Sequence, residues 1–350
     1  LAVQGRGSLK QPHQPGGSVV KQIINDNIRI DREVAANAME SVRQWLKSAP
    51  DLSDPIATLA SPHPAVTLNP LPSTSELVPH AVITYLIGRK REHWLDLLDS
   101  LRSLALHLLA RWPYPVVIFH EGLSAEDMER LRQIYPQLSF HRLDKSFLFP
   151  PNHVNLSHVP KIIGGHASVG YRHMCRFFSG SMFNYPLLAQ YEWWMRMDSD
   201  SFLLGDVQVD PFARMRDNGY VYGYMALGRE DDYLTTGLWA AAQAYMKKAG
   251  IDQPTPLLSK FLDDETGDWD RSYFYTNFEV GHLPFFRSEA YQSFFRHLDK
   301  EGGFYYYRWG DAPIRLLGVA LHSEPGSVFR FGDIPYSHKV YVLLPDEGEE

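Results

Sequence analysis

The chain has 350 residues, a formal net charge of −7 and a single cysteine. This length can form one large α/β domain with a substantial hydrophobic core. The acidic balance excludes a general basic field that would attract nucleic acid, so an anionic substrate has to be held by local groups. One cysteine excludes an intrachain disulfide, and no apolar run in the sequence approaches the roughly 20 residues that span a bilayer.

The first 80 residues differ in composition from the rest of the chain. Residues 1–30 are rich in Gly, Gln, Pro and Ser, which predicts a flexible tail or stem. Residues 31–80 predict one helix followed by a proline-rich extended strap, because the prolines prevent a long helix. We expect contact with a membrane only through an N-terminal anchor that would precede Leu1.

From residue 81 onward, apolar runs alternate with amphipathic segments. The predicted elements are, in chain order, a strand over 81–87, a helix over 92–111, a strand over 115–119, a helix over 124–135 and a strand over 138–143. This order predicts a parallel sheet with right-handed crossovers. Such a sheet binds ligands beyond the carboxyl ends of its strands, which places Arg89 at the expected mouth. Neither a dinucleotide-binding glycine motif nor a P-loop motif is present in this half, which disfavours both functions.

The strongest local signal is the stretch EWWMRMDSD over residues 192–200. In a strand, residues two apart share a face, so Arg196, Asp198 and Asp200 line up opposite the apolar side chains. Two carboxylates at a strand end suit a hard divalent cation such as Mn²⁺ or Mg²⁺, which can bridge a diphosphate. Arg196 can pair with the same phosphates. Two aspartates at this spacing often form only a solvated turn, but the apolar runs on both sides favour the metal interpretation.

Two further segments combine aromatic and acidic residues. Tyr275 and Glu279 lie in an aromatic stretch, where the glutamate is either a satisfied buried acid or a reacting group; the residues alone favour the buried acid. Residues 305–313, YYYRWGDAP, include Asp311. They suit either a sugar site, with aromatic rings on C–H faces, or an aromatic core with a capping aspartate.

Two basic candidates are weaker when taken alone. Arg172 lies beside Cys175 in a segment that either meets a phosphate or covers a helix face. His338 is one of 15 histidines, and a single histidine is more often a core or surface residue than a ligand. Cys175 has no base pattern beside it, which favours a small buried side chain over a nucleophile.

Residues 171–180, YRHMCRFFSG, closely resemble a signature of glycosyltransferase family 15, the fungal Golgi α-1,2-mannosyltransferases that extend N- and O-linked glycans. Further matching blocks follow in family order and extend the resemblance over about residues 81–341; they are 186–200, 221–223, 277–279, 302–305, 308–313 and 332–338. The resemblance implies a GT-A fold, an α/β mixed sheet flanked by helices. It also implies GDP-mannose as donor, Mn²⁺ as metal, retention of the anomeric configuration and residence in the Golgi lumen as a type II membrane protein.

The resemblance assigns metal and catalytic roles residue by residue. Asp198 and His338 match the family's metal ligands, and Asp200 is expected to assist them. Glu279 matches the candidate nucleophile, which either attacks the anomeric carbon or stabilises an oxocarbenium-like state during same-face transfer. Tyr171 matches a tyrosine beside the reacting centre.

The expected donor- and acceptor-binding residues are Arg89, Arg172, Arg196, Tyr275 and Asp311. Arg196 and Asp311 match family positions of this kind, and Arg89 aligns with a nucleotide-binding arginine. Arg172 would add positive charge near the leaving group.

The sequence therefore predicts one catalytic domain over residues 81–345, with a nucleotide-binding half over 81–200 and an acceptor-binding half over 201–345. The expected reaction transfers mannose from GDP-mannose to a hydroxyl of a glycan or glycoprotein. Two departures from the family leave other donors, such as a UDP-hexose, open: the metal motif is Asp-Ser-Asp where the family usually has Glu-Pro-Asp, and residues 228–237 differ from the fungal pattern. A non-catalytic glycan- or nucleotide-binding protein on the same scaffold is the more distant alternative.

Overall fold

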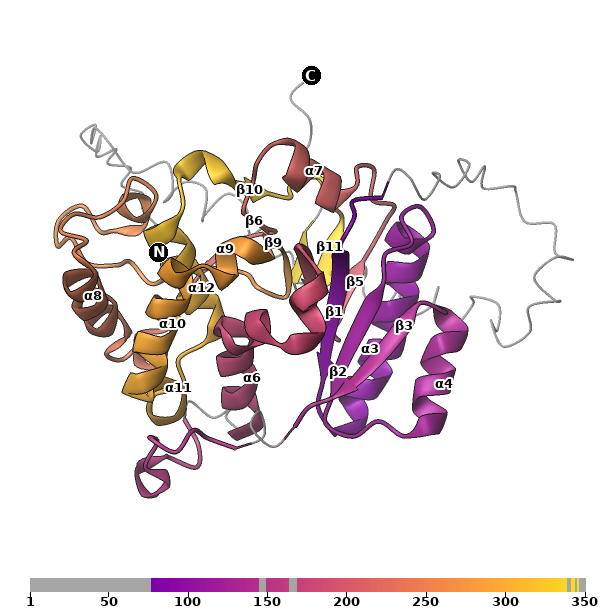
Figure 1. Cartoon of the computed structure of the whole chain (residues 1–350), viewed down its shortest axis with the longest axis horizontal. Coiled ribbons are helices and arrows are strands. Elements are labelled where there is room, and N and C mark those ends of the chain that lie inside the picture. Colours follow the sequence, from indigo (N-terminus) through magenta and orange to yellow (C-terminus); the bar gives the residue numbers. More distant parts are fainter. Residues whose placement is uncertain (1–76, 145–148, 164–168, 339–340, 344, 346–350) are drawn as a thin grey trace, which may run out of the picture.

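The computed structural model describes residues 77–144, 149–163, 169–338, 341–343 and 345 (Figure 1). The tail predicted over 1–30 lies outside the described residues, as does the helix and strap over 31–80 apart from its last four positions. In the part of the chain that is described, no helix combines the length and apolar character needed to cross a membrane.

A seven-stranded mixed sheet forms the centre, in the order β10-β6-β9-β4-β1-β2-β3. Its strands are β1 (Ala81–Ile87), β2 (Val116–His120), β3 (Leu138–Arg142), β4 (Trp193–Met197), β6 (Tyr222–Tyr224), β9 (Phe278–His282) and β10 (Val328–Arg330). Strand β9 runs antiparallel to β4 and β6, and all other neighbours are parallel. The three strands predicted in the first half are confirmed to within one residue at each end, and they pair in parallel as expected.

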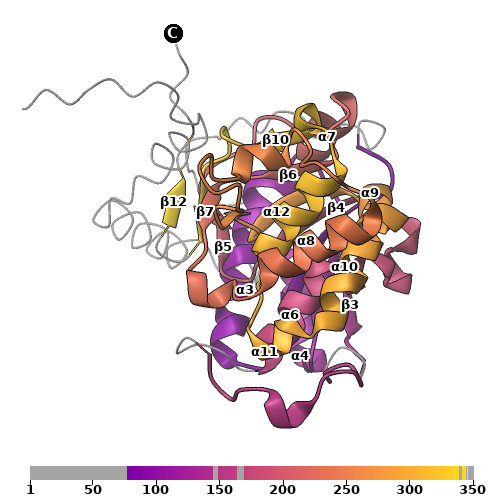
Figure 2. The same ribbon diagram turned by 90° about the vertical axis from the view of Figure 1, so that its left-hand side faces the viewer.

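Helices cover both faces of this sheet (Figures 1 and 2). On one face lie α3 (Arg91–Leu104), which continues as a π-helical turn (Ala105–Leu109), α4 (Ala125–Ile134) and α7 (Pro211–Asp217). On the other face lie α6 (Val169–Ser179), α8 (Leu238–Ala249), α9 (Leu283–Arg287), α10 (Glu289–Glu301), α11 (Gly303–Tyr306) and α12 (Asp311–His322). Both predicted helices are present, and Ser124 begins α4 with a capping box, its hydroxyl accepting from the amide of Asp127 at 3.0 Å.

Two small sheets extend the central one. Strands β5 (Ser201–Leu203), β11 (Tyr336–His338) and β12 (Tyr341–Leu343) form an antiparallel sheet in the order β12-β11-β5. Strands β7 (Leu227–Arg229) and β8 (Ser272–Phe274) form an antiparallel pair. Because His338 pairs with Ser201 across β11 and β5, a residue near the end of the domain lies beside the segment that follows β4.

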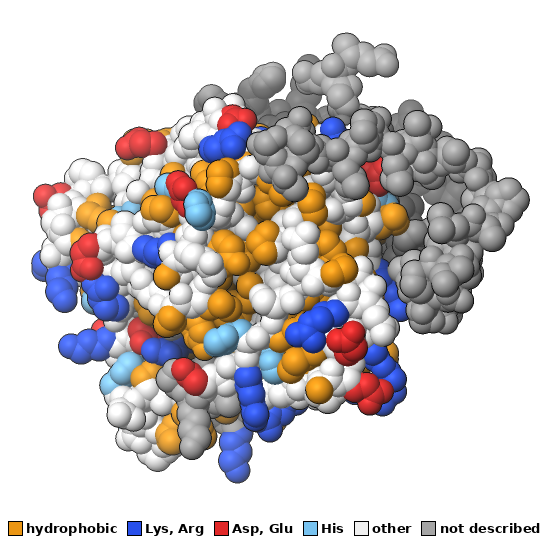
Figure 3. All heavy atoms as spheres, turned by 45° about the vertical axis from the view of Figure 1, so that its right-hand side comes forward, with side chains coloured by type: hydrophobic (Ala, Val, Ile, Leu, Met, Phe, Trp, Pro, Cys, Tyr) orange, Lys and Arg blue, Asp and Glu red, His pale blue; other side chains and the backbone are white. Residues whose placement is uncertain are grey.

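Each face of the central sheet has its own apolar core, because side chains alternate between the faces of a strand. In β1, Val82 packs toward α6 and α12, whereas Ile83 and Tyr85 pack toward α3. On the face shown in Figure 3, acidic and basic side chains are interspersed around the margin instead of gathering into one basic field.

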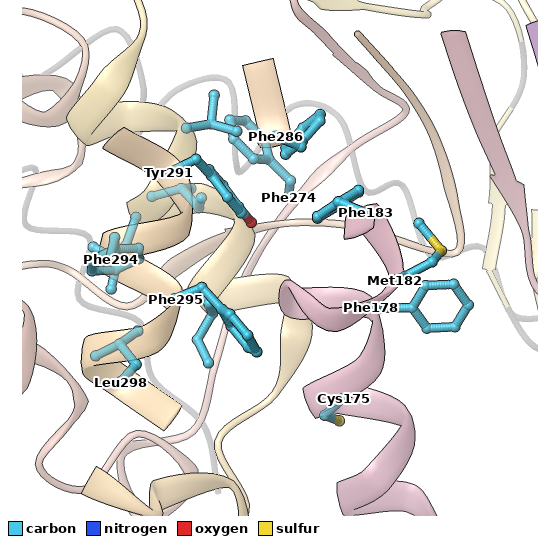
Figure 4. Packing of buried hydrophobic residues seen from close by; sticks show 14 of the residues in the cluster. Cys175, Phe178, Met182, Phe183, Phe274, Phe286, Tyr291, Phe294, Phe295 and Leu298 are labelled. Atoms are coloured by element: carbon cyan, nitrogen blue, oxygen red, sulfur yellow. The ribbon is translucent and has the colours of Figure 1, made fainter. Parts of the chain in front are cut away.

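Gly180, at the end of α6, tests how tightly the larger core is packed. A Cβ added there would lie 2.2 Å from Cγ of Phe295, a buried side chain of α10 that faces α6 in Figure 4. We expect Gly180→Ala to lower the free energy of unfolding by about 2 kcal/mol, the usual cost of overpacking a core. Urea unfolding measures this loss. Gly326→Ala is the matched control, since nothing lies within 4 Å of its added Cβ, and an equal loss in both variants would contradict the packing argument.

Candidate active site

The candidate site begins where β4 ends. Asp198 directly follows the strand, and its amide donates to the carbonyl of Asn277 at 2.9 Å. On the far side of the turn, Ser100 of α3 donates its hydroxyl to the carbonyl of Ser201 at 2.5 Å. Arg196 precedes Asp198 by two positions, and the alternating residues Met195 and Met197 belong to the core beneath α3, as the strand pattern predicted. Strand β4 thus packs apolar side chains into the cores on both faces and ends with Arg196 and Asp198 on the face that also carries Trp194.

Asp198, Asp200 and His338 meet at this end of the sheet. Each offers one ligand atom, and these atoms lie within 4.8 Å of one another. The Nε2 atom of His338 is 3.1 Å from Asp200 Oδ1. Two carboxylates and an imidazole form a donor set that suits a first-row divalent cation such as Mn²⁺. The arrangement brings together three residues that the sequence predicted as metal ligands.

Neighbouring side chains fix the orientation of His338. The hydroxyl of Tyr275 lies 2.6 Å from Nδ1, and the amide nitrogen of Asn277 lies 3.2 Å from Nε2. A contact at Nδ1 selects the tautomer and aims Nε2 at the carboxylates, the usual arrangement for a histidine that binds metal. Tyr275, predicted to bind the donor, therefore lies behind the histidine and holds its ring.

The charge on Asp198 is only partly compensated by the protein. Burial raises the pKa of Asp198, its partner Arg196 lowers it, and the nearby Asp200 raises it further. A bound cation would remove this repulsion between the two carboxylates, because an opposite charge within about 4–6 Å favours the ionised form.

Arg196 connects the cluster of Asp198, Asp200 and His338 to two buried acids. Its Nε donates to Asp198 Oδ1 at 2.8 Å, and its Nη1 donates to Asp311 Oδ2 at 2.6 Å and, more weakly, to Glu279 Oε1 at 3.4 Å. Burial alone would lower the pKa of Arg196, but the three acids raise it well above its usual value, so the guanidinium stays charged. Because protein carboxylates occupy these donors, the geometry favours a linking role for Arg196 over direct pairing with phosphate.

Asp311 is ionised within the same network. Burial opposes its charge, but Arg196 and the hydroxyl of Thr276, which donates at 2.9 Å, outweigh this effect and hold the pKa of Asp311 below its ordinary value. Neighbouring Trp309 is buried in the core and donates its indole N–H to the carbonyl of Thr236 at 2.8 Å. Tyr305 is also buried. Of the two interpretations of this segment, the aromatic core describes Tyr305 and Trp309 correctly.

Glu279 is fully buried, with its carboxylate at the meeting point of three side chains. Its Oε2 accepts from the hydroxyl of Tyr222 and from Nε of Arg315, both at 2.9 Å. Burial raises the pKa of Glu279, and Arg315 and Arg196 oppose that shift. The position matches the buried acid that the residues alone favoured.

Arg315 was not predicted from the sequence as a site residue. It is fully buried in α12, donates to the hydroxyl of Tyr291 and the carbonyl of Phe178, both at 2.6 Å, and lies between aromatic rings. The available signal was its place in the otherwise apolar run Ile314–Leu321, because an arginine in such a run needs a buried acid as partner.

Three other predicted residues lie at different depths. Tyr171 is 37% exposed in the first turn of α6, beside the network. Arg172, the next residue, is fully buried and donates to the carbonyls of Tyr305 and Pro160 at 2.8 and 2.7 Å, which favours a structural role over a phosphate contact. Arg89 is exposed at the end of β1, 3.6 Å from Glu121, and does not join the cluster.

Sequence and structure comparisons with known proteins are consistent with this geometry. Residues 33–349 match the sequence model of a family described as glycolipid 2-alpha-mannosyltransferase. The glycolipid 2-alpha-mannosyltransferase of Saccharomyces cerevisiae is 28% identical over 339 residues, which cover 94% of this chain and 76% of the relative. The probable mannosyltransferase KTR3 of the same yeast is 38% identical over 182 residues, 52% of this chain and 45% of the relative. The chain thus spans about half the length of the latter protein.

Solved structures agree in fold. The Mn/GDP form of core-mannan synthase A (CmsA/Ktr4) from Aspergillus fumigatus is 26% identical, with a TM-score of 0.71 over 77% of each chain. The mannosyltransferase Ktr4p from S. cerevisiae in complex with GDP gives a TM-score of 0.70 at 22% identity, covering 91% of this chain and 83% of that one. The predicted GT-A fold is therefore confirmed, and the match over residues 33–349 shows that the chain belongs to the glycolipid 2-alpha-mannosyltransferase family, glycosyltransferase family 15.

Proposed function

We propose that this protein is a retaining, divalent-metal-dependent α-1,2-mannosyltransferase that moves mannose from GDP-mannose to a hydroxyl of a glycan or glycoprotein. The observation that carries the proposal is the meeting of Asp198, Asp200 and His338 within 4.8 Å at the end of β4. Family membership and a structural relative whose solved form contains Mn and GDP support it. Residence in the Golgi lumen belongs to the same proposal.

The metal site would be formed by Asp198, Asp200 and His338. When bound, Mn²⁺ or Mg²⁺ supplies positive charge that stabilises a departing nucleoside diphosphate. Tyr275 holds the imidazole of His338 in place, and Arg196 holds Asp198. The protein thereby presents its ligand atoms already oriented, which lowers the entropic cost of binding.

Glu279 and Tyr171 serve the sugar transfer in different ways. Glu279 is fully buried and accepts hydrogen bonds on both oxygens, which favours a role as fixed negative charge over attack on the anomeric carbon. This supports same-face transfer. The neighbouring sulfur of Cys175 raises the pKa of Tyr171 above its usual value, so its hydroxyl remains protonated and can donate to the leaving phosphate or the incoming hydroxyl.

Turnover of sugar nucleotides tests the proposal. Purified protein is incubated with Mn²⁺, methyl α-mannoside and either GDP-mannose or a UDP-hexose, and released nucleoside diphosphate is measured. We expect Mn²⁺-dependent release of GDP from GDP-mannose and an α-linked product by NMR. Turnover of another donor alone would overturn the donor assignment. Binding of donor without turnover would support the non-catalytic alternative.

The contact behind His338 gives a separate prediction. Tyr275→Phe removes the hydroxyl that lies 2.6 Å from Nδ1 of His338. We expect Mn²⁺ affinity to fall about 10- to 100-fold, the usual effect of losing a partner of a metal-binding histidine. Titration with Mn²⁺, followed by electron paramagnetic resonance of the free ion, measures the change. Tyr220→Phe, on a ring that stacks on Phe329 away from the cluster, is the control, and equal affinities in wild type and Tyr275→Phe would exclude this role.

A further inference from the structure

Arg308 has an uncommon backbone conformation at the edge of the site. Its φ is +65°, in the left-handed region, which costs a residue with a side chain about 1 kcal/mol or more. The centre of its guanidinium lies 4.5 Å from the centroid of the Tyr171 ring. The buried Nε has no hydrogen-bond partner among the described residues. The chain thus retains a strained arginine whose buried donor is not used by the surrounding protein that the structure describes.

Glu230, the residue after β7, lies near the segment that contains Arg308. It is half-buried, and from the described residues its Oε1 accepts a single long hydrogen bond, 3.3 Å, donated by the amide of Asp231. Its Oε2 lies 3.7 Å from the position that a Cβ on Gly310 would take, which places it beside the segment between Arg308 and Asp311. Burial raises the pKa of Glu230, and the charge of Arg308 opposes this rise, which places the two groups within electrostatic reach.

The opposite charges of Glu230 and Arg308 identify a class of ligand. Within the described residues, no ion pair of 4 Å or less joins Glu230 to Arg308, so each can bind a third group. Glu230 and Asp311 would repel a phosphate, whereas a neutral polyol satisfies both signs: a carboxylate accepts from hydroxyls and a guanidinium donates to their oxygens. The Tyr171 ring, which lies against the guanidinium of Arg308, adds an aromatic face at the same place.

We propose that Glu230 and Arg308 bind hydroxyls of a hexose ring beside Tyr171 and so help to determine which sugar the site accepts. This inference rests on the proposed function, whose sugar subsite it specifies. Glu230 also lies in residues 228–237, the segment that departs from the family pattern, which fits a residue that sets specificity. The hexose is either that of the donor or that of the acceptor.

The test compares Arg308→Asn, Arg308→Lys and Glu230→Gln with the wild type. Asparagine tolerates the left-handed conformation, so Arg308→Asn removes the guanidinium without adding strain. We expect the KM for GDP-mannose or for methyl α-mannoside to rise about 10- to 100-fold in Arg308→Asn and Glu230→Gln. Arg308→Lys should restore part of the loss, because it keeps the charge. Affinity for GDP with Mn²⁺, measured by calorimetry, should stay within about twofold.

The pattern of changes separates the outcomes. A rise in the donor KM alone assigns the donor hexose, and a rise in the acceptor KM alone assigns the acceptor. A parallel loss of GDP affinity would show a phosphate contact and overturn the inference, as would unchanged KM values for both sugars. Arg216→Met, which removes an exposed arginine paired with Asp217, is the control.

Wild-type turnover is measured first, so that failure of the proposed function is distinguished from failure of the hexose-site inference. If the wild type does not turn over GDP-mannose, ligand-observed NMR of the hexose signals of methyl α-mannoside and of GDP-mannose still tests the pair. Binding that is lost in Arg308→Asn and Glu230→Gln would support a hexose site, and equal binding or no binding in the wild type would overturn it.

Discussion

Asp198→Asn is expected to lower kcat for mannosyl transfer by about 10³-fold or more. The substitution removes a charged ligand from the cluster with Asp200 and His338 and leaves Nε of Arg196 without its carboxylate. A metal supplies several kcal/mol of charge stabilisation in such reactions, and each 1.36 kcal/mol is a factor of ten in rate. Single-turnover transfer from GDP-mannose at saturating Mn²⁺ measures the loss, and a Mn²⁺ titration shows whether affinity falls with it.

The control for this experiment is another aspartate paired with a histidine. Asp206 accepts from Nδ1 of His107 at 2.8 Å on the surface, outside the cluster. Asp206→Asn should keep kcat within about twofold. If Asp198→Asn retains transfer at the wild-type rate, the metal interpretation fails, whatever other role the aspartate has.

Arg315→Met is expected to lower the free energy of unfolding by about 3–5 kcal/mol. Methionine can fill much of the volume and contact the rings of Phe183 and Phe286, on which the guanidinium now lies. The loss comes instead from Glu279, which would remain fully buried with one cationic partner removed. Removing one member of a buried ion pair usually costs this much. Urea unfolding, followed by tryptophan fluorescence, measures the difference.

The double variant Glu279→Gln/Arg315→Met identifies the cause. Removing both charges should recover at least about 1 kcal/mol relative to Arg315→Met alone, because no uncompensated carboxylate remains. If the double variant is less stable by the sum of both single losses, the two residues are not coupled and the cost of Arg315→Met arises from packing.

Local sequence patterns predicted the strands and helices of residues 81–143. β1 and β2 are apolar runs bounded by polar or proline residues, and Ser124 signals the start of α4. The strand pattern predicted that Asp198 and Asp200 form part of the cluster. Only the family resemblance added His338, because no local pattern marks this histidine. Its place depends on the pairing of β11 with β5, which no periodicity of either segment reveals.

Partners of charged residues were the least predictable feature. Arg172 and Arg315 both occur in helices, yet Arg172 donates to backbone carbonyls and Arg315 donates to Glu279. Which partner an arginine meets is determined by the packing of α6, α12 and the central sheet against one another. The sequence therefore predicted that Asp198 and Asp200 lie together at the end of β4, but it did not predict that backbone carbonyls accept from the guanidinium of Arg172.

The pairing of β11 with β5 also has a consequence for synthesis of the chain. Asp200 and His338 are 138 residues apart, so at about 5–20 residues per second the histidine leaves the ribosome roughly 7–28 s after the aspartate. During that interval strands β1 to β4 are already available to pair, whereas the cation cluster is incomplete. Divalent metal therefore cannot guide folding of the early sheet. Binding of a cation at the proposed site would instead report that the last strands have docked, and a nascent chain arrested before β11 should fold its first strands but remain insensitive to Mn²⁺.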